Sequence, residues 1–313
     1  MPVTVGIIGL GIMGQLMARQ WLQAGYPVHG YDIRPEACAW LTDLGGVAEA
    51  DSPSVAQQAD VLVLSLPSAT ACHEVAARIA PCCHASQTRK LVLETSTLAW
   101  DDKIAFAACF DAARVDVLDC PILGTANQPG DRQWTIYLSG PPQACEQARL
   151  ILGVLSQDLP YVGLYGASSQ FKLLANHLVA IYNVAYAEVI NMARCWSLDP
   201  STITDLMLRT PLLATGVMRN RMPMMSDRVY EPATMKIDIW QKDMQIILAL
   251  AQHIGAATPL LNACAAVYTQ GQKNGLGRQD TAAVAEVLRK DSPHLANQQD
   301  SPDAPQAPRV SPY

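Results

Sequence analysis

The sequence predicts an α/β chain in which a doubly wound, mainly parallel sheet is followed by an all-α part. In the first half of the 313 residues, short apolar runs alternate with helical repeats, which is typical of strand–helix–strand units. A glycine-rich turn follows the first run. No Gly or Pro interrupts residues 168–197, so one long helix is expected to link the two parts.

The first half is predicted to begin with a strand and to alternate between strands and helices. Expected strands are residues 3–10, 28–31, 61–66, 91–94, 115–118, 134–138 and a short run near Tyr161. Helices are expected at residues 13–24, from Asp51 or Ser52 onward, and at 69–80, 99–113 and 142–155. Apolar residues recur there at three- and four-residue steps, or a proline follows a capping residue.

The second half is predicted to be helical throughout. Asp199, Thr258 and Asp280 are favourable helix starts, the first two because a proline follows them. We therefore expect one domain over residues 1–165 and an all-helical one over residues 166–290. Residues 291–313 hold five prolines and few apolar side chains, which predicts a disordered tail.

The composition excludes several classes of protein. A net charge of −6 without a basic stripe argues against a nucleic-acid partner. No apolar run approaches the roughly 20 residues of a membrane span, and the first run lacks the basic flank of a signal peptide. Nine cysteines, an odd number without CxxC or zinc spacing, predict reduced thiols, no metal site and a cytoplasmic location.

A glycine-rich hexapeptide follows the first strand and opens the first helix. It reads Gly9-Leu10-Gly11-Ile12-Met13-Gly14, a G-x-G-x-x-G in the context that a dinucleotide site requires. Gly9 permits a tight turn, Gly11 lets the backbone approach a pyrophosphate, and Gly14 lets the helix pack against the strand. The N–H groups of the helix start then face the phosphates. The first domain is thus predicted to be a Rossmann-type domain that binds a nicotinamide dinucleotide.

Asp32 ends the second strand, 18 residues after Gly14. Its carboxylate can accept hydrogen bonds from the adenosine ribose, and its charge repels a 2′-phosphate, which favours NAD. Arg34 leaves NADP open as the alternative, because an arginine there can accommodate that phosphate.

The glycine motif, followed by Met17-Ala18, resembles the opening of the β-hydroxyacid dehydrogenases. This family includes 3-hydroxyisobutyrate dehydrogenase and tartronate semialdehyde reductase, and it is related to 6-phosphogluconate dehydrogenase. The resemblance extends to about Lys290. It implies that Pro67 and the pair Ser96-Thr97 contact the cofactor from two strand ends. Without the resemblance, these residues are equally explained as turn formers.

A later loop is similar to the family's substrate loop, usually D-A-P-V-S-G-G, but it departs at two positions. Here it reads Asp119-Cys120-Pro121-Ile122-Leu123-Gly124-Thr125. Leu123 replaces the serine and has no side-chain donor, whereas Thr125 supplies a hydroxyl. The backbone N–H groups of Gly124 and Thr125 remain available for a substrate carboxylate. The two departures are expected to change which substrate binds more than they change the reaction that is catalysed.

Lys172 and Asn176 are four residues apart and share a face of the long helix. The residues alone favour a solvated face, but the resemblance matches them to the family's catalytic lysine and asparagine. A lysine can take the hydroxyl proton in oxidation and return it in reduction, while the asparagine orients the same oxygen. Ala175 departs from the family, in which an Asn or His is common at that position.

A second charged pair, Lys242-Asp243, fits the family's late Lys-Asp pair. The resemblance implies that Lys242 contacts substrate or cofactor. Asp243 would lie near the substrate and help to fix the helix. Taken alone, charged neighbours on a helix are equally explained as a solvated face.

Together these features predict an NAD(P)-dependent oxidoreductase acting on a short 3-hydroxy acid or its semialdehyde. Hydride would pass between nicotinamide and the carbinol carbon in the cleft between the domains. One alternative is an NADPH-dependent imine reductase of the same fold, since Leu123 suits a less polar substrate. Another is a non-catalytic cofactor-binding interaction module. Lys172 argues against both, because such relatives commonly lack the lysine.

The low charged content, 16% against an average of about 25%, has a further consequence. Obligate interfaces tolerate few charges, and the resemblance implies assembly through the helical domain. We therefore expect a homodimer or homotetramer in which the apolar helices at residues 168–197 and 236–254 face a partner subunit.

Overall fold

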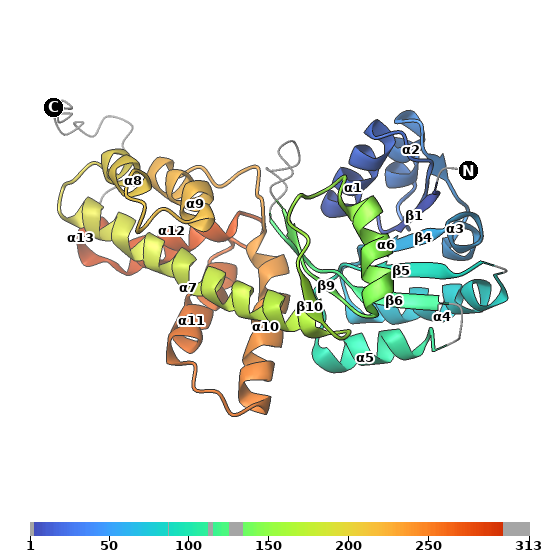
Figure 1. Cartoon of the computed structure of the whole chain (residues 1–313). Helices are drawn as coiled ribbons and strands as arrows, with labels where there is room; N and C mark the ends of the chain where they lie inside the picture. The colour runs from blue at the N-terminus through green and yellow to red at the C-terminus, as the bar shows by residue number, and fades with distance from the viewer. Residues whose placement is uncertain (1–2, 87, 112–114, 125–133, 297–313) are drawn as a thin grey trace. The chain divides into compact units, whose positions relative to one another are not determined.

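The computed structural model describes residues 3–86, 88–111, 115–124 and 134–296. The chain divides into two compact units, Met1–Leu173 and Leu174–Tyr313. The division falls within the long helix α7 (Ala167–Cys195), which is common to both (Figure 1). The described part of the first unit is α/β and that of the second is helical, which confirms the predicted fold class.

The first unit is built on an eight-stranded sheet in the order β10-β9-β6-β5-β4-β1-β2-β3. Every neighbouring pair is parallel except β6 and β9, which are antiparallel. The strands of this sheet are β1 (Val5–Ile8), β2 (Val28–Tyr31), β3 (Val47–Ala48), β4 (Val61–Leu64), β5 (Lys90–Glu94), β6 (Val115–Asp119), β9 (Leu138–Ser139) and β10 (Tyr161–Gly163).

Helices cover both faces of this sheet because successive strand residues point to opposite sides. One core holds Ile7 of β1 with α1, α2 and α6, and the other holds Ile8 with α3, α4 and α5. The six helices are α1 (Ile12–Gln23), α2 (Pro35–Asp43), α3 (Ser52–Gln58), α4 (Ala69–Ala85), α5 (Trp100–Ala108) and α6 (Pro142–Leu152). The sheet is therefore doubly wound, as the sequence predicted.

Three predicted elements differ from the structure. The helix expected at residues 69–80 continues through Pro81 to Ala85. The strand expected at residues 134–138 is broken, because the chain changes partner at Tyr137. β8 (Thr135–Ile136) forms a small hairpin with β7 (Ile122–Leu123), whereas β9 joins the main sheet. The helix expected at residues 99–113 ends at Ala108. A turn there brings Phe110 into the core against Phe106, with 5.3 Å between the ring centroids.

The second unit packs shorter helices around the remainder of α7. These are α8 (Pro200–Leu208), α9 (Gly216–Asp227), α10 (Ile237–His253), α11 (Pro259–Lys273), the 3₁₀ turn η1 (Thr281–Ala283), α12 (Val284–Asp291) and α13 (Pro293–Ala296). Part of the predicted tail is thus helical, and Leu295 of α13 is buried. Residues 297–313 lie outside the described part of the chain.

Helix α7 is long and apolar enough to cross a membrane, judged by length and composition alone. Its buried amides have partners inside the second unit. Asn183 Nδ2 donates to the Tyr268 hydroxyl at 3.0 Å and to the Thr281 carbonyl at 2.7 Å, and Asn191 Nδ2 donates to the Ala285 carbonyl at 2.8 Å. Buried amide donors that are paired with neighbouring elements are typical of the core helix of a helical domain.

Candidate active site

The glycine turn between β1 and α1 combines two tight contacts with one open position. A Cβ on Gly9, whose φ is +96°, would lie 2.2 Å from the Ser65 carbonyl oxygen. A Cβ on Gly14 would lie 2.0 Å from the Gly9 carbonyl oxygen. A Cβ on Gly11 meets nothing within 4 Å. Gly9 and Gly14 are therefore needed for packing, whereas Gly11 leaves a cradle beside the N-terminus of α1, where dinucleotide phosphates fit.

Asp32, which directly follows β2, is hydrogen-bonded to the glycine turn. Its Oδ2 accepts from the Leu10 N–H at 2.8 Å, and its Oδ1 accepts from Arg34 Nε at 2.9 Å. Arg34 Nη2 in turn donates to the Leu10 carbonyl at 2.9 Å. Burial raises the pKa of Asp32, but the hydrogen bonds from Arg34 and Leu10 outweigh it and hold that pKa below the ordinary value. Asp32 is therefore an ionised acceptor at neutral pH.

The other predicted cofactor contacts lie at the carboxyl ends of β4 and β5, which follow β1 in the sheet. Pro67 is exposed just after β4, and Ser96 and Thr97 follow β5. The Leu66 N–H donates to Ser96 Oγ at 3.0 Å, so the two strand-end loops are joined. Together with the glycine turn they form one edge of the sheet, at which α/β proteins bind nucleotides.

Lys172 contacts the predicted substrate loop within the first unit. Its Nζ donates to the Ile122 carbonyl at 2.8 Å. Leu123 is half-buried and pairs with Thr135 in the β7–β8 hairpin. A Cβ on Gly124 would lie 2.2 Å from Trp134 Cδ1, so this position requires glycine. Thr125 lies outside the described residues.

Asn176 lies one turn beyond Lys172 on α7 and contacts α10. Its Nδ2 donates to Asp243 Oδ2 at 3.0 Å, and it is 3% exposed. Lys242 Nζ lies 3.5 Å from Asp243 Oδ1. The structure thus brings Asn176, Lys242 and Asp243 together in the second unit, with Asp243 bonded to the asparagine amide.

A buried charged cluster at the sheet edge was not predicted. Lys103 of α5 contacts Glu94 at the end of β5 and lies 2.8 Å from Asp119 Oδ1 at the end of β6. All three side chains are fully buried. Burial lowers the pKa of Lys103, but the charges of Glu94 and Asp119 outweigh it and raise that pKa above the ordinary value. The sequence signal that could have revealed this cluster is that Glu94 and Asp119 each end an apolar strand, where a buried carboxylate needs a partner.

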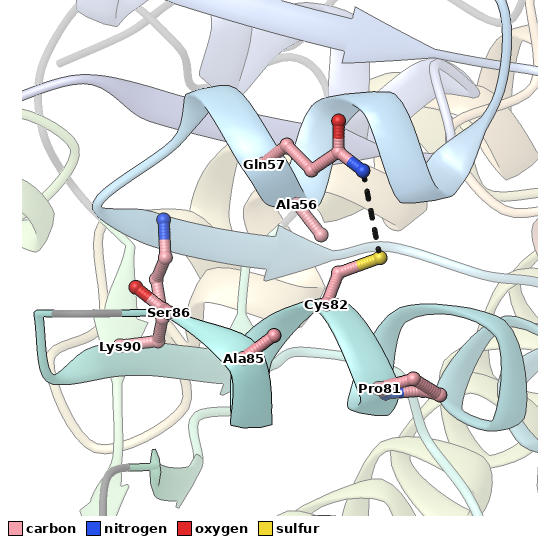
Figure 2. A pocket seen from close by; sticks show the side chains of 7 residues that line it. All are labelled: Ala56, Gln57, Pro81, Cys82, Ala85, Ser86 and Lys90. Atoms are coloured by element: carbon pink, nitrogen blue, oxygen red, sulfur yellow. Dashed lines mark hydrogen bonds between the residues drawn. The ribbon is translucent and has the colours of Figure 1, made fainter.

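A separate cavity of about 370 Å³ lies between α3 and α4 beside the start of β5. Figure 2 shows its lining of Ala56, Gln57, Pro81, Cys82, Ala85, Ser86 and Lys90. Lys90 is the first residue of β5, so the cavity lies at the amino end of that strand. Nucleotides bind at the carboxyl ends of such strands, so this cavity is distinct from the cofactor site.

Comparisons with known proteins identify the family of the chain. Residues 4–163 match the family described as the NAD binding domain of 6-phosphogluconate dehydrogenase. Residues 166–288 match the NAD-binding family of NADP-dependent 3-hydroxyisobutyrate dehydrogenase. The chain belongs to the β-hydroxyacid dehydrogenase family. It is an NAD(P)-dependent oxidoreductase of the hydroxyacid dehydrogenase type.

Individual relatives are distant but cover nearly the whole chain. L-threonate dehydrogenase from Cupriavidus necator is 27% identical over 92% of this chain and 97% of its own. The structure of 3-hydroxyisobutyrate dehydrogenase from Mycobacterium tuberculosis has a TM-score of 0.81 at 21% identity, covering 92% and 100% of the two chains. An imine reductase from Pseudomonas has a TM-score of 0.59 at 20% identity over 92% and 100%. The fold is thus closer to the hydroxyisobutyrate enzyme than to this imine reductase.

Proposed function

We propose that this dehydrogenase interconverts a short 3-hydroxy acid and its carbonyl product, with Lys172 as the general acid and base. The observation that carries the proposal is the placement of Lys172 Nζ, 2.8 Å from the Ile122 carbonyl in the loop that matches the family's substrate loop. An ammonium has three donors, so it can contact Ile122 and a substrate oxygen together. The dinucleotide, when bound, supplies or accepts the hydride.

The chain's own residues then handle the proton and the substrate's orientation. In oxidation, neutral Lys172 removes the hydroxyl proton, and in reduction its ammonium returns a proton to the same oxygen. Asn176 is proposed to orient that oxygen, with Asp243 holding the amide. The N–H groups of Gly124 and Thr125, with the Thr125 hydroxyl, are proposed to bind the carboxylate. Leu123 adds an apolar wall, so we expect a substrate with an apolar or weakly polar flank.

Lys172→Ala tests the catalytic assignment. General acid–base residues contribute about 10²–10⁴-fold, so turnover should fall by that factor while the dissociation constant for the cofactor stays within about threefold. Lys273→Ala, on an exposed turn of α11, is the matched control and should keep full turnover. Near-normal turnover of Lys172→Ala, with intact cofactor binding, would remove Lys172 from the mechanism.

The substrate class is tested by a panel of 3-hydroxy acids and their semialdehydes, with L-threonate included because the Cupriavidus necator relative is named for it. The apolar Leu123 also favours imine reduction as a second candidate, so a cyclic imine belongs in the panel. We expect turnover of the acids and none of the imine. Cofactor binding without turnover of any compound would instead favour an interaction module.

We also propose a homodimer or homotetramer in the cytoplasm that uses NAD in preference to NADP. Ionised Asp32 supports the cofactor preference, because a carboxylate repels a 2′-phosphate. The nine cysteines are all free thiols, which is typical of a reducing compartment.

A further inference from the structure

The start of α7 is bonded to β9 through the Ser168 N–H and Ser139 Oγ, and to two residues of the substrate loop, Asp119 and Ile122. Asp119 ends β6, and its Oδ2 accepts from the Ser169 N–H at 2.8 Å while its Oδ1 accepts from Ser169 Oγ at 2.9 Å. Three residues beyond Asp119, the Ile122 carbonyl accepts from Lys172 Nζ. The first N–H groups of a helix have no partner within it, so Asp119 satisfies one that would otherwise be buried and unpaired.

Asp119 is itself held in place by a buried cation. Its Oδ1 lies 2.8 Å from Lys103 Nζ, which also contacts Glu94. Glu94 Oε1 accepts from the Ser96 N–H at 2.6 Å, which links the cluster to the predicted cofactor loop. The cluster therefore carries a net charge of −1, the sum of two carboxylates and one ammonium, with a helix N-terminus directed at it.

We propose that Asp119, held by Lys103, is a positioning residue that sets the location and the charge environment of Lys172. The proposal rests on the proposed role of Lys172 as acid and base. The Asp119 carboxylate is bonded to the first turn of α7. The Lys172 ammonium, one turn later, is therefore held in a fixed position next to the loop that follows Asp119. Its negative charge also favours the protonated form of Lys172.

Among the described residues, Tyr165 and Cys120 are titratable groups close to both carboxylates. Burial raises the pKa of both Tyr165 and Cys120 above the ordinary values, so they stay neutral at pH 7. In the part of the chain that the structure describes, Asp119, Glu94 and Lys103 form the charged cluster that contacts the first turn of α7.

Asp119→Asn tests the proposal, with Asp116→Asn as its matched control. Asp116 lies on the same strand and is paired with Arg89 at 2.6 Å, with no bond to α7. A misplacement of about 1 Å costs about 100-fold, so Asp119→Asn should lower kcat by about 10–100-fold while cofactor affinity stays within about threefold. Asp116→Asn should keep kcat within about twofold.

The pH profile separates positioning from a loss of folded protein. Loss of the Asp119 charge lowers the pKa of Lys172, so the acidic limb of the oxidation rate should move to lower pH in Asp119→Asn. The double variant Lys103→Met/Asp119→Asn keeps the net charge of −1 and should return the limb to its wild-type position, while kcat stays low. A low kcat in Asp119→Asn with an unmoved limb would overturn the electrostatic part of the proposal.

Amide hydrogen exchange gives a readout that needs no substrate. Exchange in residues 167–172 should quicken about tenfold or more in Asp119→Asn and stay unchanged in Asp116→Asn, because the asparagine keeps only one acceptor oxygen, which Lys103 Nζ draws away from the Ser169 N–H. Equal exchange and equal kcat in the two variants would overturn the positioning role. If Lys172→Ala instead keeps turnover, the proposed function of Lys172 fails, and exchange still decides whether Asp119 holds the helix.

Discussion

Single glycines in the nucleotide turn have different roles, although the motif treats them alike. Gly9 and Gly14 fit against backbone oxygens at distances that no side chain allows, whereas Gly11 faces open space. The fold requires the first two, and we propose that the ligand requires the third. Structure and sequence agree here because a turn between a strand and a helix is specified by adjacent residues.

Gly11→Ala should leave the fold intact and weaken dinucleotide binding by about tenfold or more, because the added methyl occupies the side from which phosphates approach. Thermal unfolding and isothermal titration with NAD measure the two effects. Gly216→Ala is the control, since a Cβ there also meets nothing within 4 Å. Unchanged NAD affinity in Gly11→Ala would contradict the assigned cradle.

Asp32→Ala should reverse the cofactor preference. Hydrogen bonds to charged groups contribute about 1.5–3 kcal/mol, so NAD affinity should fall by about 10–100-fold. The same change releases Arg34, which can then pair with a 2′-phosphate and strengthen NADP binding. Titrations with both cofactors measure the ratio. A wild-type enzyme that binds NADP more tightly than NAD would disprove our preference for NAD.

At the scale of elements, the sequence predicted the helices and strands that local residue patterns specify. It did not predict contacts between residues that are distant in the sequence. Helix α7 was predicted over residues 168–197 and forms over Ala167–Cys195, since unbroken apolar periodicity specifies it. The Lys103 cluster was missed because its members come from three elements, and a lysine in a helical pattern is usually solvated. The two-residue strand β3 and the hairpin partner β7 are too short for a periodic signal.

The turn η1 depends on one buried ion pair, and we expect acid to break it. Asp280 is fully buried, with Arg221 Nε 3.3 Å from its Oδ1, and it accepts from the Thr234 N–H at 2.7 Å. Burial raises the pKa of Asp280, but Arg221 and these hydrogen bonds outweigh it and hold that pKa below the ordinary value of an aspartate. The stabilisation is therefore present above about pH 4 and is lost as the pH falls through the native pKa.

Asp280→Asn should lower the free energy of unfolding by about 3–5 kcal/mol at pH 7, because it leaves Arg221 buried without its charge partner. The variant should also lose less stability than the wild type on acidification. Urea unfolding at several pH values measures both effects. Asp205→Asn, at an exposed position of α8, should match the wild type. Parallel acid profiles for wild type and Asp280→Asn would contradict this account.

At the scale of the whole molecule, an apolar stripe on the second-unit part of α7 supports the proposed assembly. Leu174, Leu178 and Met192 lie on this helix and Trp196 lies just beyond its end, and all four are exposed. Their spacing places them along one side of a helix. A stripe of this kind is typical of a face that packs against another subunit.

Light scattering at micromolar concentration should therefore give the mass of a dimer or tetramer. Leu178→Glu should shift the protein toward monomer, because a buried charge without a partner disfavours an apolar interface. Leu44→Glu, at an exposed apolar residue of the first unit, should leave the mass unchanged. A monomeric wild-type protein would contradict the assembly.

The central claim is that Lys172 moves the proton in the oxidation of a short 3-hydroxy acid. The most direct measurement is kcat/KM for the panel of acids with NAD, using protium and deuterium at the carbinol carbon, for wild type and Lys172→Ala. We expect deuterium at the carbinol carbon to lower kcat/KM. We also expect kcat/KM to be about 10²–10⁴-fold lower in Lys172→Ala than in the wild type. Turnover of the acids at equal rates by both proteins would contradict it.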